Sequence, residues 1–203
     1  MNFIAHRGIW KDKSEQNSFL GIKKAFDLGF GVELDVRDRN GELIVSHDPP
    51  NSVEVLTFQE IVELSSRYDS MLAINIKSDG IREKLETALS GLDQVRFFLF
   101  DMSIPETLGY LSSGLPTYMR LSEYEAHSEL HNRSQGIWLD SFQSDWWLGK
   151  SAIFQDETRV CVVSPELHGR DVTDAWQYLR NINTTANLYI CTDLPERARV
   201  YFE

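Results

Sequence analysis

Short runs rich in β-branched and aromatic residues recur along the chain, and apolar residues at helical spacing follow each of them. Runs of this kind predict strands, and the spacing between them predicts helices. A further extended segment, residues 42–47, follows the turn Asn40-Gly41, which is a strong hairpin signal. We expect the main strands at residues 2–6, 32–37, 72–77, 95–101, 117–121, 136–140, 159–164 and 188–192.

The clearest helical pattern covers residues 18–28 and ends at Gly29. Thr57 and Glu60 have the spacing of a capping box, which predicts the start of another helix. The alternation of strands and helices predicts a parallel sheet of βα units, and the expected fold is a compact (β/α)8 TIM barrel in one domain, residues 1–203. An open doubly wound sheet is the alternative. Weaker helical patterns occupy residues 81–92, 105–111, 122–131, 145–154, 171–181 and 195–201.

Most of the predicted strands end in polar residues. Because side chains alternate between the two faces of a strand, Glu33 and Asp35 share one face, and Asn75 and Lys77 share one face of the next strand. Barrel enzymes build their active sites at the C-terminal ends of the strands, so this pattern favours a barrel with a functional site. The polar strand ends are His6, Glu33, Asp35, Asn75, Lys77, Asp101, Arg120, Asp140, Ser164, Thr192 and Asp193.

The charge and the composition narrow the class of protein. The net charge is −11, so we expect no nucleic-acid partner. The chain shows neither a signal-peptide pattern nor an apolar run long enough to span a membrane, so we expect no transmembrane segment and a cytoplasmic protein. Cys161 and Cys191 lie in apolar runs, and we expect buried free thiols on neighbouring strands, with a disulfide or metal pair as the alternative.

Several of the polar strand ends combine into a candidate chemistry. Glu33 and Asp35 offer a hard-oxygen site for Mg²⁺ or Ca²⁺. His6 and His47 can divide the work of a general base and a general acid, because the ordinary pKa of histidine is near neutral. Arg7 and Lys77 are suitable ligands for a phosphate, although they could equally be ion-pair partners of the two carboxylates. Taken together, these groups suit a reaction at a phosphate ester.

The same residues resemble the motifs of the glycerophosphodiester phosphodiesterase family. The strong similarity covers residues 3–50, with weaker similarity around residues 73–77 and 190–195. The motifs are Ala5-His6-Arg7-Gly8, Gln16-Asn17-Ser18, Ala25-Phe26, Gly31-Val32-Glu33-Leu34-Asp35-Val36, Asn40-Gly41 and Val45-Ser46-His47-Asp48. The resemblance implies a barrel in which the two histidines are the general acid and base, the Glu-x-Asp pair holds one divalent cation, and the arginine and lysine contact the phosphate.

This sequence departs from the family pattern in three places. Asn75 stands where the family has a third metal-binding carboxylate, which predicts weaker metal binding because an amide brings no charge. Gln16 stands where the family has glutamate. Residues 48–71 leave no room for the small subdomain that many members insert there, so a larger substrate has space.

The segment after the seventh predicted strand has no family explanation. Glu166 there could supply the carboxylate missing at Asn75, with His168 or Arg170 contacting the substrate; an ordinary polar loop is the alternative. Trp10 follows the first histidine motif and is the tryptophan best placed to line a pocket.

The leading hypothesis is therefore a phosphoric diester hydrolase (EC 3.1.4.-) that acts on a glycerophosphodiester or on a larger lipid- or glycan-derived phosphodiester, in lipid metabolism. A degenerate barrel that binds a phosphate-containing ligand without turnover is the first alternative, and Asn75 is the residue that favours it. A metal-dependent sugar-phosphate lyase or isomerase is the second, since a fold does not determine its function. The oligomeric state is left open.

Overall fold

Strands and helices alternate along the chain in the computed structural model, which describes residues 1–52, 54–155 and 159–203. The chain forms two compact units, an N-terminal unit of Ala5–Thr117 and a C-terminal unit of Met1–Ile4 with Tyr118–Glu203. Strand β1 (Asn2–His6) is divided between the units and neighbours β2 in one and β9 in the other. Eight parallel strands with helices between them are the arrangement of a (β/α)8 barrel, so the predicted fold class is confirmed. The single domain stays a prediction.

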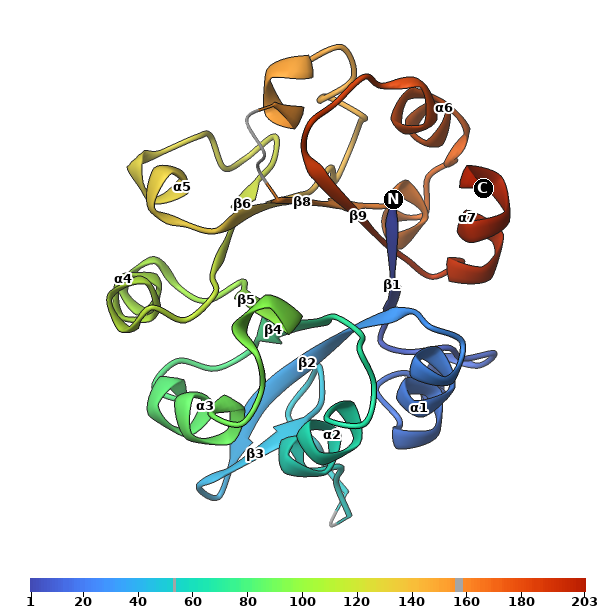
Figure 1. Cartoon of the computed structure of the whole chain (residues 1–203). Helices are drawn as coiled ribbons and strands as arrows, with labels where there is room; N and C mark the ends of the chain where they lie inside the picture. The colour runs from blue at the N-terminus through green and yellow to red at the C-terminus, as the bar shows by residue number, and fades with distance from the viewer. Residues whose placement is uncertain (53, 156–158) are drawn as a thin grey trace. The chain divides into compact units, whose positions relative to one another are not determined.

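The N-terminal unit is a parallel sheet with helices packed beside it (Figure 1). Strand β3 pairs antiparallel with β2, as the Asn40-Gly41 turn predicts. The capping box at Thr57 is present at the start of α2. The elements are η1 (Lys13–Glu15), α1 (Phe19–Asp27), β2 (Gly31–Arg39), β3 (Glu42–Val45), α2 (Phe58–Ser65), β4 (Leu72–Ile76), α3 (Arg82–Leu89), η2 (Gln94–Arg96), β5 (Phe97–Phe100) and α4 (Ile104–Ser113).

The apolar face of β2 forms the centre of this unit's core. Val32, Leu34 and Val36 are fully buried, as are Ile22 and Ala25 on the inner face of α1. Because the side chains of a strand alternate, Glu33 and Asp35 point away from this core, yet they are buried as well. The polar face of β2 is therefore enclosed rather than exposed to water.

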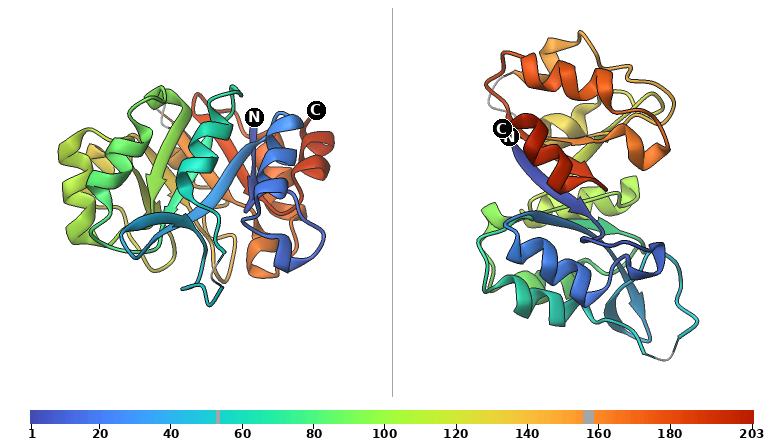
Figure 2. Two further views of the ribbon diagram at one scale, coloured as in Figure 1. Left: turned by 90° about the horizontal axis from the view of Figure 1, so that it is seen from below. Right: turned by 90° about the vertical axis from the view of Figure 1, so that its right-hand side faces the viewer.

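The C-terminal unit repeats the pattern, and Figure 2 shows α6 and α7 beside its strands. Its core contains Val160 and Val162 of β8, Ile190 of β9, Trp176 of α6 and Ala198 of α7. The elements are β6 (Tyr118–Leu121), α5 (Glu129–Arg133), β7 (Gly136–Leu139), η3 (Ser151–Phe154), β8 (Arg159–Val163), η4 (Pro165–His168), α6 (Thr173–Asn181), β9 (Asn187–Thr192) and α7 (Pro195–Phe202).

Two predicted helices of this unit are wrong in extent. The helix expected at residues 122–131 begins only at Glu129, because the Ser122 hydroxyl accepts from the backbone N–H groups of Tyr124 and Glu125 and holds a turn instead. The helix expected at residues 145–154 is replaced by turns and the short η3, and Gly149 interrupts it with a φ of +78°.

The two cysteines agree with the sequence-based expectation. Cys161 and Cys191 are buried free thiols on the neighbouring strands β8 and β9. No helix among the described residues is long and apolar enough to cross a membrane.

Burial of His131 on α5 predicts a pH-dependent stability. Its Nδ1 accepts from the N–H of Ser128 (3.1 Å) and its Nε2 lies 3.0 Å from the carbonyl oxygen of Arg120, an arrangement that the neutral imidazole satisfies. Burial lowers the pKa of His131 below its ordinary 6.5. The unfolded chain therefore binds this proton first, and the free energy of unfolding should fall as the pH drops below about 6.5.

Urea denaturation at pH 7.5 and pH 5.5 measures this effect, and His131→Gln should reduce the loss of stability between the two values. His127 stays unchanged in both proteins, because its ring stacks on His131 with the centroids 4.8 Å apart and its charge also lowers the pKa of His131. Equal pH dependence in wild type and His131→Gln would show that His131 does not titrate in this range.

Candidate functional site

Strand β2 places two acidic side chains on one buried face. Glu33 and Asp35 are both essentially inaccessible to water. In the parallel ladder with β4, Asp35 is the direct partner of Asn75. Side chains of laterally paired residues lie on the same face, so Asn75 joins the two carboxylates. The predicted grouping of Glu33, Asp35 and Asn75 is thus present in the N-terminal unit.

Asp35 is the most heavily contacted residue of this face. Its Oδ2 lies 2.9 Å from Arg7 Nε, and its Oδ1 lies 3.3 Å from Lys77 Nζ. Asn17 adds two hydrogen bonds, since its Nδ2 donates to Asp35 Oδ2 (2.8 Å) and its Oδ1 accepts from the Asp35 N–H (3.3 Å). Two cations and one amide thus fix a single buried carboxylate. The sequence alone left Arg7 and Lys77 open as phosphate ligands or ion-pair partners, and in this structure they are ion-pair partners of Asp35.

Glu33 lies beside the first histidine. His6 Nε2 is 3.8 Å from Glu33 Oε2, and the Arg7 N–H donates to the same oxygen at 3.3 Å. Burial, followed by the nearby charge of Asp35, raises the pKa of Glu33 to about 7, although His6, Arg7 and Lys77 lower it. The cations present therefore do not fully compensate the two buried carboxylates.

A turn in the left-handed region positions the residues after β1. Arg7, Gly8 and Asn17 all have a positive φ, of 57°, 86° and 57°. The turn is held by backbone bonds, because Arg7 N–H donates to Glu33 O (2.9 Å) and Asn17 N–H donates to Arg7 O (3.0 Å). The guanidinium is steadied further by Gln16, whose Oε1 accepts from Arg7 Nη1 at 3.2 Å.

His47 reaches the neighbourhood of Asp35 through the backbone. The N–H of Ser46 donates to Asp35 O (2.9 Å), so His47 follows directly after a residue bound to β2. Its side chain is 44% exposed, and Nδ1 lies 2.9 Å from Asp48 Oδ1. The structure thus groups His6, Arg7 and Lys77 around the carboxylates, while the His47 ring contacts Asp48.

The acceptors on this face suit a divalent cation. Asn75 Oδ1 is buried and has no hydrogen-bond partner among the described residues, which leaves an oxygen that requires a donor or a cation. Glu33 and Asp35 supply carboxylate oxygens beside it, and hard cations prefer oxygen ligands of these kinds. Within the described residues, no cluster of three or more His, Cys, Asp or Glu side chains is placed to hold a metal ion.

The other proposed carboxylate, Glu166, lies in the C-terminal unit. Its Oε1 accepts from the hydroxyl of Thr192 and from the N–H of Asp193 (3.1 Å), and its Oε2 is buried without a hydrogen-bond partner in the described part of the chain. Its role as a metal ligand stays a prediction. Trp10, the expected pocket-lining residue, donates its indole N–H to the carbonyl oxygen of His6 (3.1 Å).

Comparison with solved structures identifies the fold. A glycerophosphodiester phosphodiesterase from Parabacteroides distasonis matches with a TM-score of 0.72 and 19% identity, over 99% of this chain and 96% of that one. The chain has the fold of the glycerophosphodiester phosphodiesterases. A phosphodiesterase from Oleispira antarctica in complex with the product sn-glycerol-3-phosphate matches with a TM-score of 0.66 and 15% identity, over 99% of this chain and 96% of that one.

A third solved structure shares the fold with a lower TM-score. A Ca²⁺-dependent phosphatidylinositol-specific phospholipase C from Streptomyces antibioticus has a TM-score of 0.54 and 12% identity, over 100% of this chain and 96% of that one. No protein-family model and no curated protein matches the sequence. The family resemblance seen in the motifs of the N-terminal third is thus supported by the fold of the whole chain.

Two residues of the site were not among the predicted site residues. Asn17 donates a hydrogen bond to Asp35, and Gln16 accepts one from Arg7. The only sequence signal was their place in the Gln16-Asn17-Ser18 motif, because nothing in the spacing shows that a loop 18 residues before Asp35 returns to contact it.

The tight turn after β1 gives a test of how the site is positioned. A Cβ atom on Gly8 would lie 2.7 Å from the backbone carbon of Gly21, which cannot move away cheaply. Gly8→Ala should therefore lower the free energy of unfolding by about 2 kcal/mol or more, from the strained φ and the clash together. Gly29 is a matched control, since it has a φ of +76° with nothing within 4 Å of its added Cβ.

Denaturant titration of both variants measures the difference. Gly29→Ala should cost only the backbone strain, about 1 kcal/mol. Equal losses in the two variants would mean that the contact with Gly21 does not constrain the turn.

Proposed function

We propose that this chain is a metal-dependent phosphodiesterase that hydrolyses a phosphodiester by general acid–base catalysis with His6 and His47. The observation that carries the proposal is the set of contacts around the buried Asp35, where Arg7 and Lys77 meet beside Glu33 and His6. Burying this many charged groups costs free energy. A purely structural role would give the fold no reason to bury them. The fold shared with glycerophosphodiester phosphodiesterases supports the same reaction.

Arg7 and Lys77 bind the phosphate in this proposal. Each side chain is 20% exposed, so both present a surface to a ligand while their contacts with Asp35 fix their orientation. The planar guanidinium matches two phosphate oxygens, and the ammonium group adds a point charge. Asp35, Asn17 and Gln16 act by holding these cations in place.

The two histidines move the protons. The side chain of His6 is 17% exposed, and its Nε2 lies 3.8 Å from Glu33 Oε2. His47 has Nδ1 next to Asp48, which leaves Nε2 for proton transfer. One histidine removes a proton from the attacking oxygen and the other donates a proton to the leaving oxygen. Which of them takes which role depends on the orientation of the substrate.

Glu33, Asp35 and Asn75 would hold one divalent cation, Mg²⁺ or Ca²⁺. Bound there, it would supply Lewis-acid stabilisation of negative charge on the phosphate. Asp35 also faces Arg7 and Lys77, so these cations compete with the metal for its charge. With a neutral amide as third ligand, the affinity should be lower than at a site with three carboxylates.

The proposed substrate is a glycerophosphodiester or a larger lipid- or glycan-derived phosphodiester. The Oleispira phosphodiesterase is described with the product sn-glycerol-3-phosphate, which favours a glycerol-linked substrate. A role in lipid metabolism, a cytoplasmic location and a single catalytic domain complete the proposal.

Hydrolysis of bis(p-nitrophenyl) phosphate, followed with added Mg²⁺ or Ca²⁺ and again with a chelator, tests the reaction class. Turnover that depends on the cation is expected. Binding of phosphate without any turnover would instead support the degenerate, non-catalytic barrel that Asn75 favours. Glycerophosphodiesters, lysolipids and glycan-linked phosphodiesters are then compared as substrates.

Replacement of the histidines should separate catalysis from folding. His6→Ala and His47→Ala should each lower kcat by about 10² to 10⁴-fold, the usual range for general acid–base residues, without a large loss of stability. His127→Ala removes an exposed histidine outside this site and should leave kcat unchanged. Full activity in either His6→Ala or His47→Ala would exclude that residue as a proton carrier.

Substitution of Asn75 tests the metal ligands without an activity assay. Asn75→Asp adds one charge with little change in shape, and it should enlarge the thermal stabilisation that Mg²⁺ or Ca²⁺ gives the protein. Asn187→Asp, at an exposed position of β9, changes the net charge equally and should not alter the response. If Glu166 already completes the site, Glu166→Gln should weaken the wild-type response and Asn75→Asp should gain nothing. No cation response in any of these proteins would remove the metal from the proposal.

A further inference from the structure

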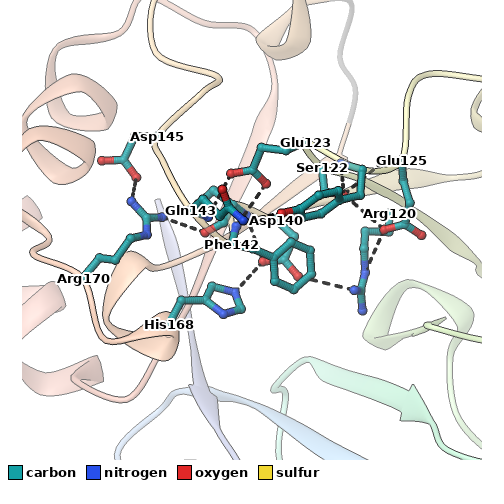
Figure 3. Close-up of polar contacts among 12 residues, drawn as sticks. Arg120, Ser122, Glu123, Glu125, Asp140, Phe142, Gln143, Asp145, His168 and Arg170 are labelled. Atoms are coloured by element: carbon teal, nitrogen blue, oxygen red, sulfur yellow. Dashed lines mark hydrogen bonds and ion pairs between the residues drawn. The ribbon is translucent and has the colours of Figure 1, made fainter.

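Side chains fix the backbones of loops at the C-terminal ends of strands in both units. In the C-terminal unit, Figure 3 shows the loop after β7 with Glu123 and Arg170 bound to it. The Glu123 carboxylate accepts from the backbone N–H groups of Phe142 (3.0 Å) and Gln143 (3.1 Å). Arg170 Nη2 donates to the carbonyl oxygen of Ser141 at 2.7 Å. In the N-terminal unit, contacts of this kind hold the loop that carries His47.

The loop after β3 begins at Ser46, and His47 is its second residue. It is closed at its base, where the N–H of Val45 donates to the carbonyl oxygen of Leu56 at 2.8 Å. The dipeptide Pro49-Pro50 follows soon after His47. Proline has no backbone N–H, so this stretch lacks the donors that a strand ladder or a helical turn requires. The carbonyl oxygens around it therefore depend on donors from other parts of the chain.

Two arginines of β2 supply such donors. Arg37 Nη1 donates to the carbonyl oxygen of His47 at 2.8 Å, and Arg39 Nη1 donates to the carbonyl oxygen of Ser52. The two acceptors lie on either side of Pro49-Pro50. Arg37 thus binds the backbone of His47 itself, whereas Arg39 binds the part of the loop beyond the prolines.

Arg37 connects His47 to the strand that bears the buried carboxylates. Because side chains alternate along β2, Arg37 shares the face of Glu33 and Asp35. Strand β2 pairs with β3 on one side and with β4 on the other, which fixes the backbone from which Arg37 extends. The N–H of Ser46 also donates to the carbonyl oxygen of Asp35, at 2.9 Å. His47 is therefore tied to β2 by its own carbonyl oxygen and by the N–H of the residue before it.

The imidazole of His47 depends on this anchored backbone. Its Nδ1 lies 2.9 Å from Asp48 Oδ1, but the Asp48 side chain is 87% exposed and belongs to the same loop. A contact within the loop moves with the loop, so it orients the ring without fixing its distance from β2. The hydrogen bond from Arg37 comes from outside the loop and fixes that distance.

We propose that Arg37 is a positioning residue for His47, and that its bond to the His47 carbonyl oxygen sets the place from which His47 transfers a proton. This role rests on the proposed function, in which His47 is one of the two proton carriers. Arg37 acts through the backbone and does not touch the reacting atoms, so a single N–H donor is sufficient for it.

Replacement of Arg37 by methionine in the full chain removes the donor and keeps an unbranched side chain. With bis(p-nitrophenyl) phosphate and added Mg²⁺ or Ca²⁺, Arg37→Met should lower kcat by about 10- to 100-fold, the cost of a misplaced group, with KM within about twofold of the wild type. Arg37→Lys should recover most of kcat, because it keeps a donor on a long side chain. Lysine would not replace an arginine that binds two phosphate oxygens.

Arg39→Met is the matched control. It removes the same kind of donor from the same face of β2, but the acceptor is Ser52 rather than His47, so kcat should stay near that of the wild type. The imidazole NMR signals of His47, identified by their absence in His47→Ala, should shift or broaden in Arg37→Met and stay unchanged in Arg39→Met. This spectroscopic comparison requires no turnover.

Wild-type kcat in Arg37→Met, or an equal loss of kcat in Arg39→Met, would overturn the role of Arg37. A raised KM with unchanged kcat would also overturn it, because Arg37 would then be a substrate ligand. If the wild type shows no cation-dependent turnover, the proposed function fails and this role fails with it, while the NMR comparison still reports whether Arg37 fixes the ring. Thermal unfolding checks the fold of each variant. If Arg37→Met does not fold, Arg37→Gln, with its shorter side chain, should show the same loss of kcat.

Discussion

The burial of two carboxylates on one face of β2 is the constraint around which the N-terminal unit is organised. Glu33 and Asp35 lie two residues apart on the same face of the strand, and neither is accessible to water. An uncompensated buried charge costs several kcal/mol, so each carboxylate requires partners. Arg7, Lys77 and Asn17 are those partners for Asp35, while Glu33 is left partly uncompensated beside His6.

The strained backbone after β1 is a consequence of that requirement. Arg7 and Asn17 are not glycines, yet both adopt a positive φ, which costs free energy for residues with a Cβ. The turn brings the Arg7 guanidinium and the Asn17 amide to the same Asp35 oxygen. The contacts with the buried carboxylate thus offset the strain, and the same turn leaves part of Arg7 exposed to a ligand.

Each unit has a polar group at the C-terminal ends of its strands, and the two groups differ in chemistry. In the N-terminal unit, two cations and a histidine surround two buried carboxylates, and a neutral amide, Asn75, occupies the next strand with an unsatisfied oxygen. In the C-terminal unit, a single buried Asp140 orients one histidine and one arginine beside an aromatic ring. The first arrangement supports the proposed phosphate and cation site, whereas in the second Asp140 is engaged by Ser141 and His168.

The sequence by itself determined most of the order of strands and helices, and the face of β2 that Glu33 and Asp35 share. Periodicity is a local property, so the alternation of strands and helices and the hairpin before His47 were readable. Alternation along β2 likewise placed Glu33 and Asp35 on one face. The helices expected at residues 122–131 and 145–154 were wrong because side-chain contacts and Gly149 overrode a weak periodic pattern.

Only the tertiary structure decided which groups meet across long stretches of chain, such as Asn17 with Asp35 or His168 with Asp140. Such contacts depend on strand register and on loop conformation, neither of which is encoded in the spacing of residues along one segment.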